Sequence, residues 1–119
     1  MNNFFKSFKF AIEGIHSTAR AERHFRVHIF VAIFVVIACI IFRIETIYFA
    51  LVLVAIFAVL VTELINTAIE RLVDLVTAKR QNPLAKLAKD AAAGAVLLAS
   101  VFAVLIGILT AWSVIRRLI

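Results

Sequence analysis

A polar stripe on one face of an expected helix is the part of this sequence best suited to chemistry. It consists of three carboxylates, an amide and a hydroxyl: Glu63, Asn66, Thr67, Glu70 and Asp74. At roughly 100° and about 1.5 Å per residue, these side chains share one side of an α-helix over about 16 Å. Carboxylate and amide oxygens suit Mg²⁺, a hard cation that usually shares its ligands with phosphate groups. The spacing therefore predicts an acidic site that can bind metal.

Glu63 favours a functional site over an acidic helix end that is merely solvated. Solvation explains Asp74 well and Glu70 tolerably, but Glu63 directly follows an apolar run, residues 46–62, that carries no charge. An ionisable residue at the edge of a membrane span is costly and usually functional. We therefore expect Glu63 to take part in chemistry.

The composition indicates a membrane protein. The chain has 119 residues, of which 65% are hydrophobic, whereas soluble domains are nearer to about 45–50% apolar. Its net charge of +6 suits anionic lipid headgroups better than nucleic acid. The single cysteine, Cys39, can form no internal disulfide and is expected to be a small buried hydrophobe. We expect one all-α integral membrane domain over residues 1–119.

Hydrophobic periodicity predicts a surface helix followed by three membrane spans. Residues 4–24 place basic side chains on one face and aromatic ones on the neighbouring face, which is typical of an amphipathic helix lying on a membrane. Residues 27–42, 46–76 and 91–115 are expected to form helices that cross the bilayer. The first of these is short for a core of about 30 Å, so the preceding residues or local thinning must make up the difference. A polar loop is expected at residues 77–87.

The distribution of Lys and Arg predicts the orientation. Residues 1–26 hold five of these side chains and residues 71–90 hold five more, whereas the turn after the first span holds only Arg43. By the positive-inside rule, the N-terminus and residues 71–90 are cytoplasmic and the C-terminus is outside. His28, near the start of the first span, is expected to be an interfacial histidine rather than a ligand. The candidate polar residues then meet at the cytoplasmic interface: Glu22, Glu63, Asn66, Glu70, Asp74, Lys89 and Asp90.

The sequence has no standard nucleotide loop. It contains no GxxxxGK[ST] motif and no kinase Gly-rich loop, so any nucleotide must be held by side chains. Zinc-binding Cys/His spacing and a GxSxG nucleophile elbow are also absent from the sequence. The residues alone predict a small inner-face membrane protein with an acidic, metal-binding site.

Longer motifs resemble a known family, the prokaryotic diacylglycerol kinases. The resemblance is carried by Glu63-x-x-Asn66-Thr67-Ala68-Ile69-Glu70-x-x-Val73-Asp74 and by Pro83-Leu84-Ala85-Lys86-x-x-Lys89-Asp90-x-Ala92-Ala93-Gly94-Ala95-Val96-Leu97. The sequence also resembles the Gram-positive branch of this family, the undecaprenol kinases, at Gly14-Ile15 and at Glu22-Arg23-x-Phe25-Arg26-x-His28. The resemblance implies a homotrimer with shared active sites that transfers the γ-phosphate of ATP to a lipid hydroxyl.

The resemblance also implies roles for individual residues. Glu63 matches the proposed general base, and Glu22 and Glu70 match the residues that hold Mg²⁺ against ATP. The expected nucleotide-binding residues are Glu22, Glu70, Asn82, Lys89 and Asp90, and the expected supporting or substrate-binding residues are Asn66, Asp74 and Arg20. Two positions depart from the family: Asn82 stands where a histidine is frequent, and Phe10 stands where enterobacterial enzymes have a tyrosine.

Three alternatives to an undecaprenol kinase remain open at this point. A diacylglycerol kinase would use the same motifs. An ion-coupled transporter subunit would place its carboxylates near the bilayer midplane, whereas these residues lie at one end of a span. A purely structural or lipid-binding subunit would leave Glu63 and Glu70 without a role.

Overall fold

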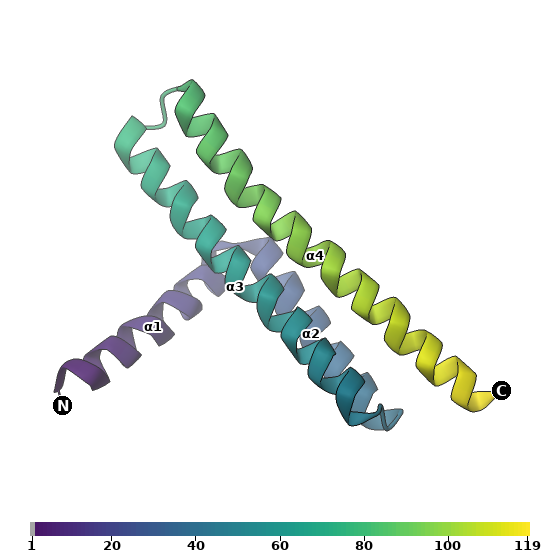
Figure 1. Ribbon diagram of the computed structural model, residues 1–119. Coiled ribbons are helices and arrows are strands. Elements are labelled where there is room, and N and C mark those ends of the chain that lie inside the picture. Colours follow the sequence, from purple (N-terminus) through teal and green to yellow (C-terminus); the bar gives the residue numbers. More distant parts are fainter. Residues whose placement is uncertain (1) are drawn as a thin grey trace.

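The computed structural model describes residues 2–119, with side chains from residue 3 onward, and this part of the chain is all-helical. Its helices are α1 (Asn2–Ala21), α2 (Arg23–Ile41), α3 (Thr46–Thr77) and α4 (Pro83–Leu118). Helices α2, α3 and α4 are long and apolar enough to cross a membrane. Figure 1 shows α1 leaving the other helices at a steep angle, as a helix lying along a membrane surface would. The prediction of three spans preceded by an N-terminal helix is confirmed.

The chain bends between α1 and α2 at a single residue, Glu22. Its backbone is extended, with φ −109° and ψ 113°. The guanidinium of Arg26 donates to the carbonyl oxygens of Ala19 (2.9 Å) and Arg20 (2.8 Å). These carbonyl oxygens lie in the last turn of α1, where the helix provides no backbone N–H partner for them. Arg26 stabilises the bend because it supplies the missing donors.

Helix α2 begins earlier than the expected first span. It starts at Arg23 and has 19 residues, which corresponds to about 28 Å at about 1.5 Å per residue. That length nearly matches a hydrocarbon core of about 30 Å. The charged segment before Val27 forms the first turn of α2, so the helix extends beyond the expected span at its N-terminal end.

Helix α3 is the centre of the fold. It packs against both α2 and α4, whereas α2 and α4, each described along its whole length, do not pack against each other. The buried face of α3 repeats at helical spacing: Val52, Ala55, Val59, Glu63 and Thr67. This single stripe is apolar up to Val59 and polar from Glu63 onward, so the packing that builds the core also positions the polar residues.

The connection between α3 and α4 is shorter than expected. Helix α4 already begins at Pro83, so the expected loop over residues 77–87 is wrong in its second half. Asn82 caps the helix, because its Oδ1 accepts hydrogen bonds from the backbone N–H groups of Leu84 (2.8 Å) and Ala85 (3.2 Å). A capping Asn followed by Pro at the first helical position is a strong start signal.

At the end of the molecule opposite the α3–α4 connection, an arginine of α4 contacts the turn between α2 and α3. The guanidinium of Arg117, in the last turn of α4, donates to the carbonyl oxygens of Arg43 (2.9 Å) and Phe42 in the turn between α2 and α3. Cys39, a few residues before this turn, is buried in a small core with Val52 and Ala55, as expected for a cysteine that packs as a hydrophobic side chain.

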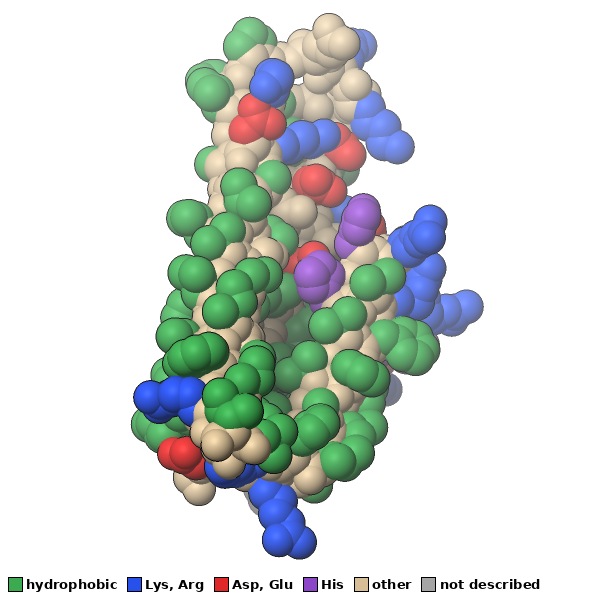
Figure 2. All heavy atoms as spheres, turned by 90° about the vertical axis from the view of Figure 1, so that its right-hand side faces the viewer, with side chains coloured by type: hydrophobic (Ala, Val, Ile, Leu, Met, Phe, Trp, Pro, Cys, Tyr) green, Lys and Arg blue, Asp and Glu red, His purple; other side chains and the backbone are tan. Residues whose placement is uncertain are grey.

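Most large apolar side chains of the three spans point outward. Phe30, Phe34 and Leu98 are 75%, 73% and 73% exposed. Figure 2 shows hydrophobic side chains over most of one face, with most charged side chains in its upper part and at its lower end. An exposed apolar band of this kind suits contact with lipid or with further membrane helices.

Candidate active site

Three helices contribute residues to one polar pocket of about 310 Å³. Its lining comes from the start of α2, the polar stripe of α3 and one face of α4: Glu22, His24, Phe25, Glu63, Asn66, Thr67, Glu70, Ala93 and Val96. The predicted convergence of Glu22 with the stripe is therefore present in a single chain. It arises because the bend at Glu22 brings the start of α2 beside the C-terminal half of α3.

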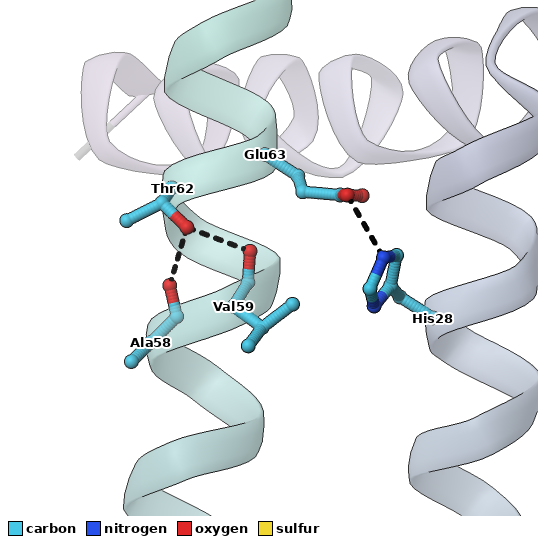
Figure 3. A network of polar contacts seen from close by, with 5 residues as sticks. All are labelled: His28, Ala58, Val59, Thr62 and Glu63. Atoms are coloured by element: carbon cyan, nitrogen blue, oxygen red, sulfur yellow. Dashed lines mark hydrogen bonds and ion pairs between the residues drawn. The ribbon is translucent and has the colours of Figure 1, made fainter. Parts of the chain in front are cut away.

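Glu63 is the most enclosed carboxylate of the pocket. Its side chain is only 11% exposed, and its Oε1 lies 3.1 Å from Nε2 of His28 on α2 (Figure 3). Burying a carboxylate is costly unless a donor or a cation compensates it. His28 supplies that compensation, so the expectation of a merely interfacial histidine missed a direct contact with the site.

The hydroxyl nearest to Glu63 in sequence does not join the site. Figure 3 shows Thr62 turned back onto its own helix, where its Oγ1 donates to the carbonyl oxygens of Ala58 (2.8 Å) and Val59 (3.0 Å). Hydroxyl groups within helices commonly bond to the carbonyl four residues earlier. Thr67, one turn after Glu63, is the threonine that lines the pocket.

The oxygen donors of the pocket fit a hard divalent cation. Glu22, the N-cap of α2, and Glu70 of α3 both line the pocket, and Oδ1 of Asn66 is a buried acceptor with no hydrogen-bond partner among the described residues. Within residues 2–119, no three His, Cys, Asp or Glu side chains converge to form a preformed metal cage. Mg²⁺ is usually bound by one or two carboxylates together with substrate phosphates and water, and the chemistry of this donor set is compatible with that mode of binding.

A second, more basic pocket of about 750 Å³ lies where α3 meets α4. Lys89 Nζ donates to Oδ1 of Asp74 (2.7 Å), and Lys86 Nζ donates to Oδ2 of Asp90 (2.6 Å). The polar stripe of α3 is thus divided, because Asp74 faces this pocket while Glu63 to Glu70 face the first. The basic side chains that line it are Lys79, Arg80, Lys86 and Lys89, and they suit a polyanion such as a triphosphate.

A third cavity, of about 290 Å³, is almost entirely apolar. It lies in the space between α2 and α4, over the apolar part of the α3 stripe, and is lined by residues such as Val35, Val59 and Val104. His28 is the only ionisable residue among those that line it. The contact between His28 and Glu63 therefore links a residue that lines the apolar cavity with a residue that lines the polar pocket.

Two expected site residues have other surroundings. Arg20 is exposed on α1 and lines none of these three pockets. Asn82 lines the basic pocket, but its side-chain oxygen, Oδ1, is occupied in capping α4. The residue that sequence reasoning undervalued is His28, whose only signal was its place at the boundary between a charged and an apolar segment.

A buried carboxylate that lines a polar pocket and contacts a residue of an apolar cavity, in a helical protein with three candidate membrane spans, fits an enzyme that brings a lipid and a water-soluble substrate together. Comparison with known proteins agrees with this class. The family model described as prokaryotic diacylglycerol kinase matches residues 9–111. The chain belongs to the prokaryotic diacylglycerol kinase family, and it is a membrane-embedded lipid kinase that uses ATP as phosphoryl donor.

Two relatives differ in the lipid that their names specify. The chain is 46% identical over 109 residues to an undecaprenol kinase of Bacillus subtilis (strain 168), covering 92% of this chain and 88% of that protein. It is 40% identical over 105 residues to a diacylglycerol kinase of Synechocystis sp. (strain ATCC 27184 / PCC 6803 / Kazusa), covering 88% of this chain and 60% of that protein. The predicted family resemblance and the prediction of a lipid kinase are confirmed.

Proposed function

We propose that this protein is an undecaprenol kinase, with residues 1–119 acting as a single membrane-embedded kinase domain at the cytoplasmic face. The observation that carries the proposal is the position of Glu63, between an apolar cavity and a polar pocket. A lipid alcohol can approach from the apolar side and a nucleotide from the polar side. The greater identity and coverage of the undecaprenol kinase relative, with the motif from Glu22 to His28, favour an isoprenoid alcohol.

Glu63 is the proposed general base. Its carboxylate accepts the proton of the lipid hydroxyl as the hydroxyl oxygen attacks the γ-phosphorus of ATP. The bond between the γ-phosphorus and the β,γ-bridging oxygen breaks, and ADP leaves with the electron pair. Phosphoryl transfer depends mainly on positioning and charge neutralisation. The nearly buried carboxylate of Glu63, held beside His28, contributes to positioning.

Glu22 and Glu70 are the proposed ligands of Mg²⁺, with Asn66 in support. Among the described residues, Oδ1 of Asn66 is buried and unpaired, and a metal-bound water or the metal itself would satisfy it. When bound, Mg²⁺ neutralises phosphate charge during transfer. Glu22 caps the start of α2 and Glu70 lies on α3, so metal binding would also tie α2 to α3.

The basic pocket is the proposed site for the rest of the nucleotide, with Lys89, Asp90 and Asn82 as its main residues. Lys89 and Lys86 are already paired with Asp74 and Asp90. A phosphate group must therefore share Lys89 with Asp74 or replace that carboxylate as its partner. Asp74 thereby acts as a supporting residue that holds Lys89 in position until ATP binds.

We further propose a homotrimer in which a neighbouring chain covers the open side of the site. The outward apolar faces of the spans and the small residues Ala91–Ala95 on α4 favour close packing between membrane helices. Glu22 and Glu63 line one pocket of the same chain, so a single chain can supply both of these residues to a site. Arg20, which lines none of the three pockets described above, is the proposed contribution of a neighbour.

The decisive experiment compares lipids side by side. Purified protein in lipid nanodiscs receives Mg-ATP labelled at the γ-phosphate and either undecaprenol or diacylglycerol. We expect the label to appear in undecaprenyl phosphate with the higher kcat/KM. A higher kcat/KM for diacylglycerol would replace the proposed substrate with the lipid named for the Synechocystis relative.

A further inference from the structure

The contact between His28 and Glu63 joins two helices at the boundary of two different cavities. His28 Nε2 lies 3.1 Å from Oε1 of Glu63, and Figure 3 shows the two side chains pointing toward each other from α2 and α3. His28 lines the apolar cavity, and Glu63 lines the polar pocket. The pair thus stands where a lipid hydroxyl from one side would meet a phosphate from the other.

We propose that His28 is a positioning residue for the catalytic base. In this role a protonated Nε2 pairs with Oε1 of Glu63, 3.1 Å away, and this leaves Oε2 as the oxygen that takes the proton from the lipid hydroxyl. His28 acts through Glu63 and does not itself exchange a proton with the substrate. The inference rests on the proposed role of Glu63 and extends it to a second residue.

The enclosure of the pair supports a specific role over an incidental surface contact. The side chains of Glu63 and His28 are 11% and 34% exposed, so water competes little for the carboxylate. A glutamate has several rotatable bonds, and the polar pocket offers it other directions toward Asn66 and Glu70. A donor on the apolar side biases the carboxylate toward the lipid, where the base is required.

The tautomer follows from the chemistry of the partner. An ionised carboxylate only accepts hydrogen bonds, so Nε2 must carry the proton in this contact. Because Nε2 is the far ring nitrogen, the reach of the side chain matters as much as its polarity. The amide nitrogen of Gln lies at nearly the reach of Nε2, whereas that of Asn lies nearer to the position of Nδ1.

This difference in reach provides the test. Three variants, His28→Phe, His28→Gln and His28→Asn, are compared with His16→Phe, the same substitution at an exposed histidine of α1 that lines none of the three pockets. We expect kcat to fall up to about 100-fold in His28→Phe and His28→Asn, with KM for ATP and lipid nearly unchanged. His28→Gln should recover most of kcat, and His16→Phe should match the wild type.

Equal kcat for His28→Gln and His28→Asn would overturn the proposal, even if His28→Phe does not fold. So would a loss in His28→Phe that appears only in KM. A second measurement places His28→Phe in the Glu63→Gln background, assayed at high enzyme concentration. There we expect no further loss of kcat, because a positioning residue has nothing left to position; a further loss of similar size would show an independent role.

The same set of variants separates the two proposals. If Glu63→Gln alone retains normal turnover, Glu63 is not the base and the proposed mechanism fails. If Glu63→Gln is inactive while His28→Phe is fully active, only the positioning role of His28 fails.

Discussion

Glu63→Gln is the most informative single change in this protein, because it removes the proposed base and preserves the shape of the side chain. Removing a general base typically lowers kcat by about 10²- to 10⁴-fold. At about 1.36 kcal/mol for each factor of ten, this corresponds to about 2.7–5.4 kcal/mol in the activation barrier. We expect kcat for undecaprenol phosphorylation to fall within this range.

The structure indicates that the fold should tolerate this substitution. The amide oxygen of Gln can still accept from Nε2 of His28, which lies 3.1 Å from Oε1 in the wild type. The change replaces a charged partner with a neutral one in a nearly buried place, which also removes the cost of keeping a charge away from water. Since a hydrogen bond contributes about 0.5–1.5 kcal/mol, we expect the free energy of unfolding to change by about 1 kcal/mol or less.

The assay follows γ-phosphate transfer in nanodiscs, together with Mg-ATP binding and thermal unfolding of the same preparations. Glu13→Gln is the matched control, because Glu13 is an exposed acid on α1 whose only close cation is Lys9, 4.0 Å away among the described residues. We expect Glu63→Gln to bind Mg-ATP normally and to turn over slowly, with Glu13→Gln unchanged. Near wild-type turnover in Glu63→Gln would refute the assignment of the base, and lost Mg-ATP binding would assign Glu63 to the nucleotide site instead.

Further expected outcomes concern the metal, the trimer and the helix cap. Glu22→Ala and Glu70→Ala should each raise the Mg²⁺ concentration needed for half-maximal activity; an unchanged Mg²⁺ titration in either variant contradicts a shared ion. Native mass spectrometry should show three chains, and inactive Arg20→Ala and Glu63→Gln chains reconstituted together should regain activity, because an intact Arg20 can then serve a neighbour's intact Glu63. A mixture that stays inactive, although crosslinking confirms mixed trimers, contradicts that arrangement. Asn82→Ala should lower the free energy of unfolding by about 1 kcal/mol through loss of the α4 cap, and unchanged unfolding would show that the cap contributes little.

The sequence alone was sufficient for the class of fold and for most of the residues that line the candidate site. Long apolar runs determine membrane spans because a bilayer requires backbone hydrogen bonds to be satisfied within each helix. Helical periodicity placed Glu63, Asn66 and Glu70 on one face, since the angle per residue of an α-helix hardly varies. The family motifs then pointed to ATP and a lipid alcohol.

Contacts between helices required the tertiary structure. The start of α4 at Pro83, by contrast, is set by a local cap from Asn82, a signal that was present in the sequence although the pattern of polar residues had suggested a longer loop. The division of the polar stripe follows from Lys89 meeting Asp74, a contact between two helices whose relative rotation no local pattern determines. For the same reason the pairing of His28 with Glu63 was missed: its geometry depends on how α2 packs against α3, and packing is a property of both helices together.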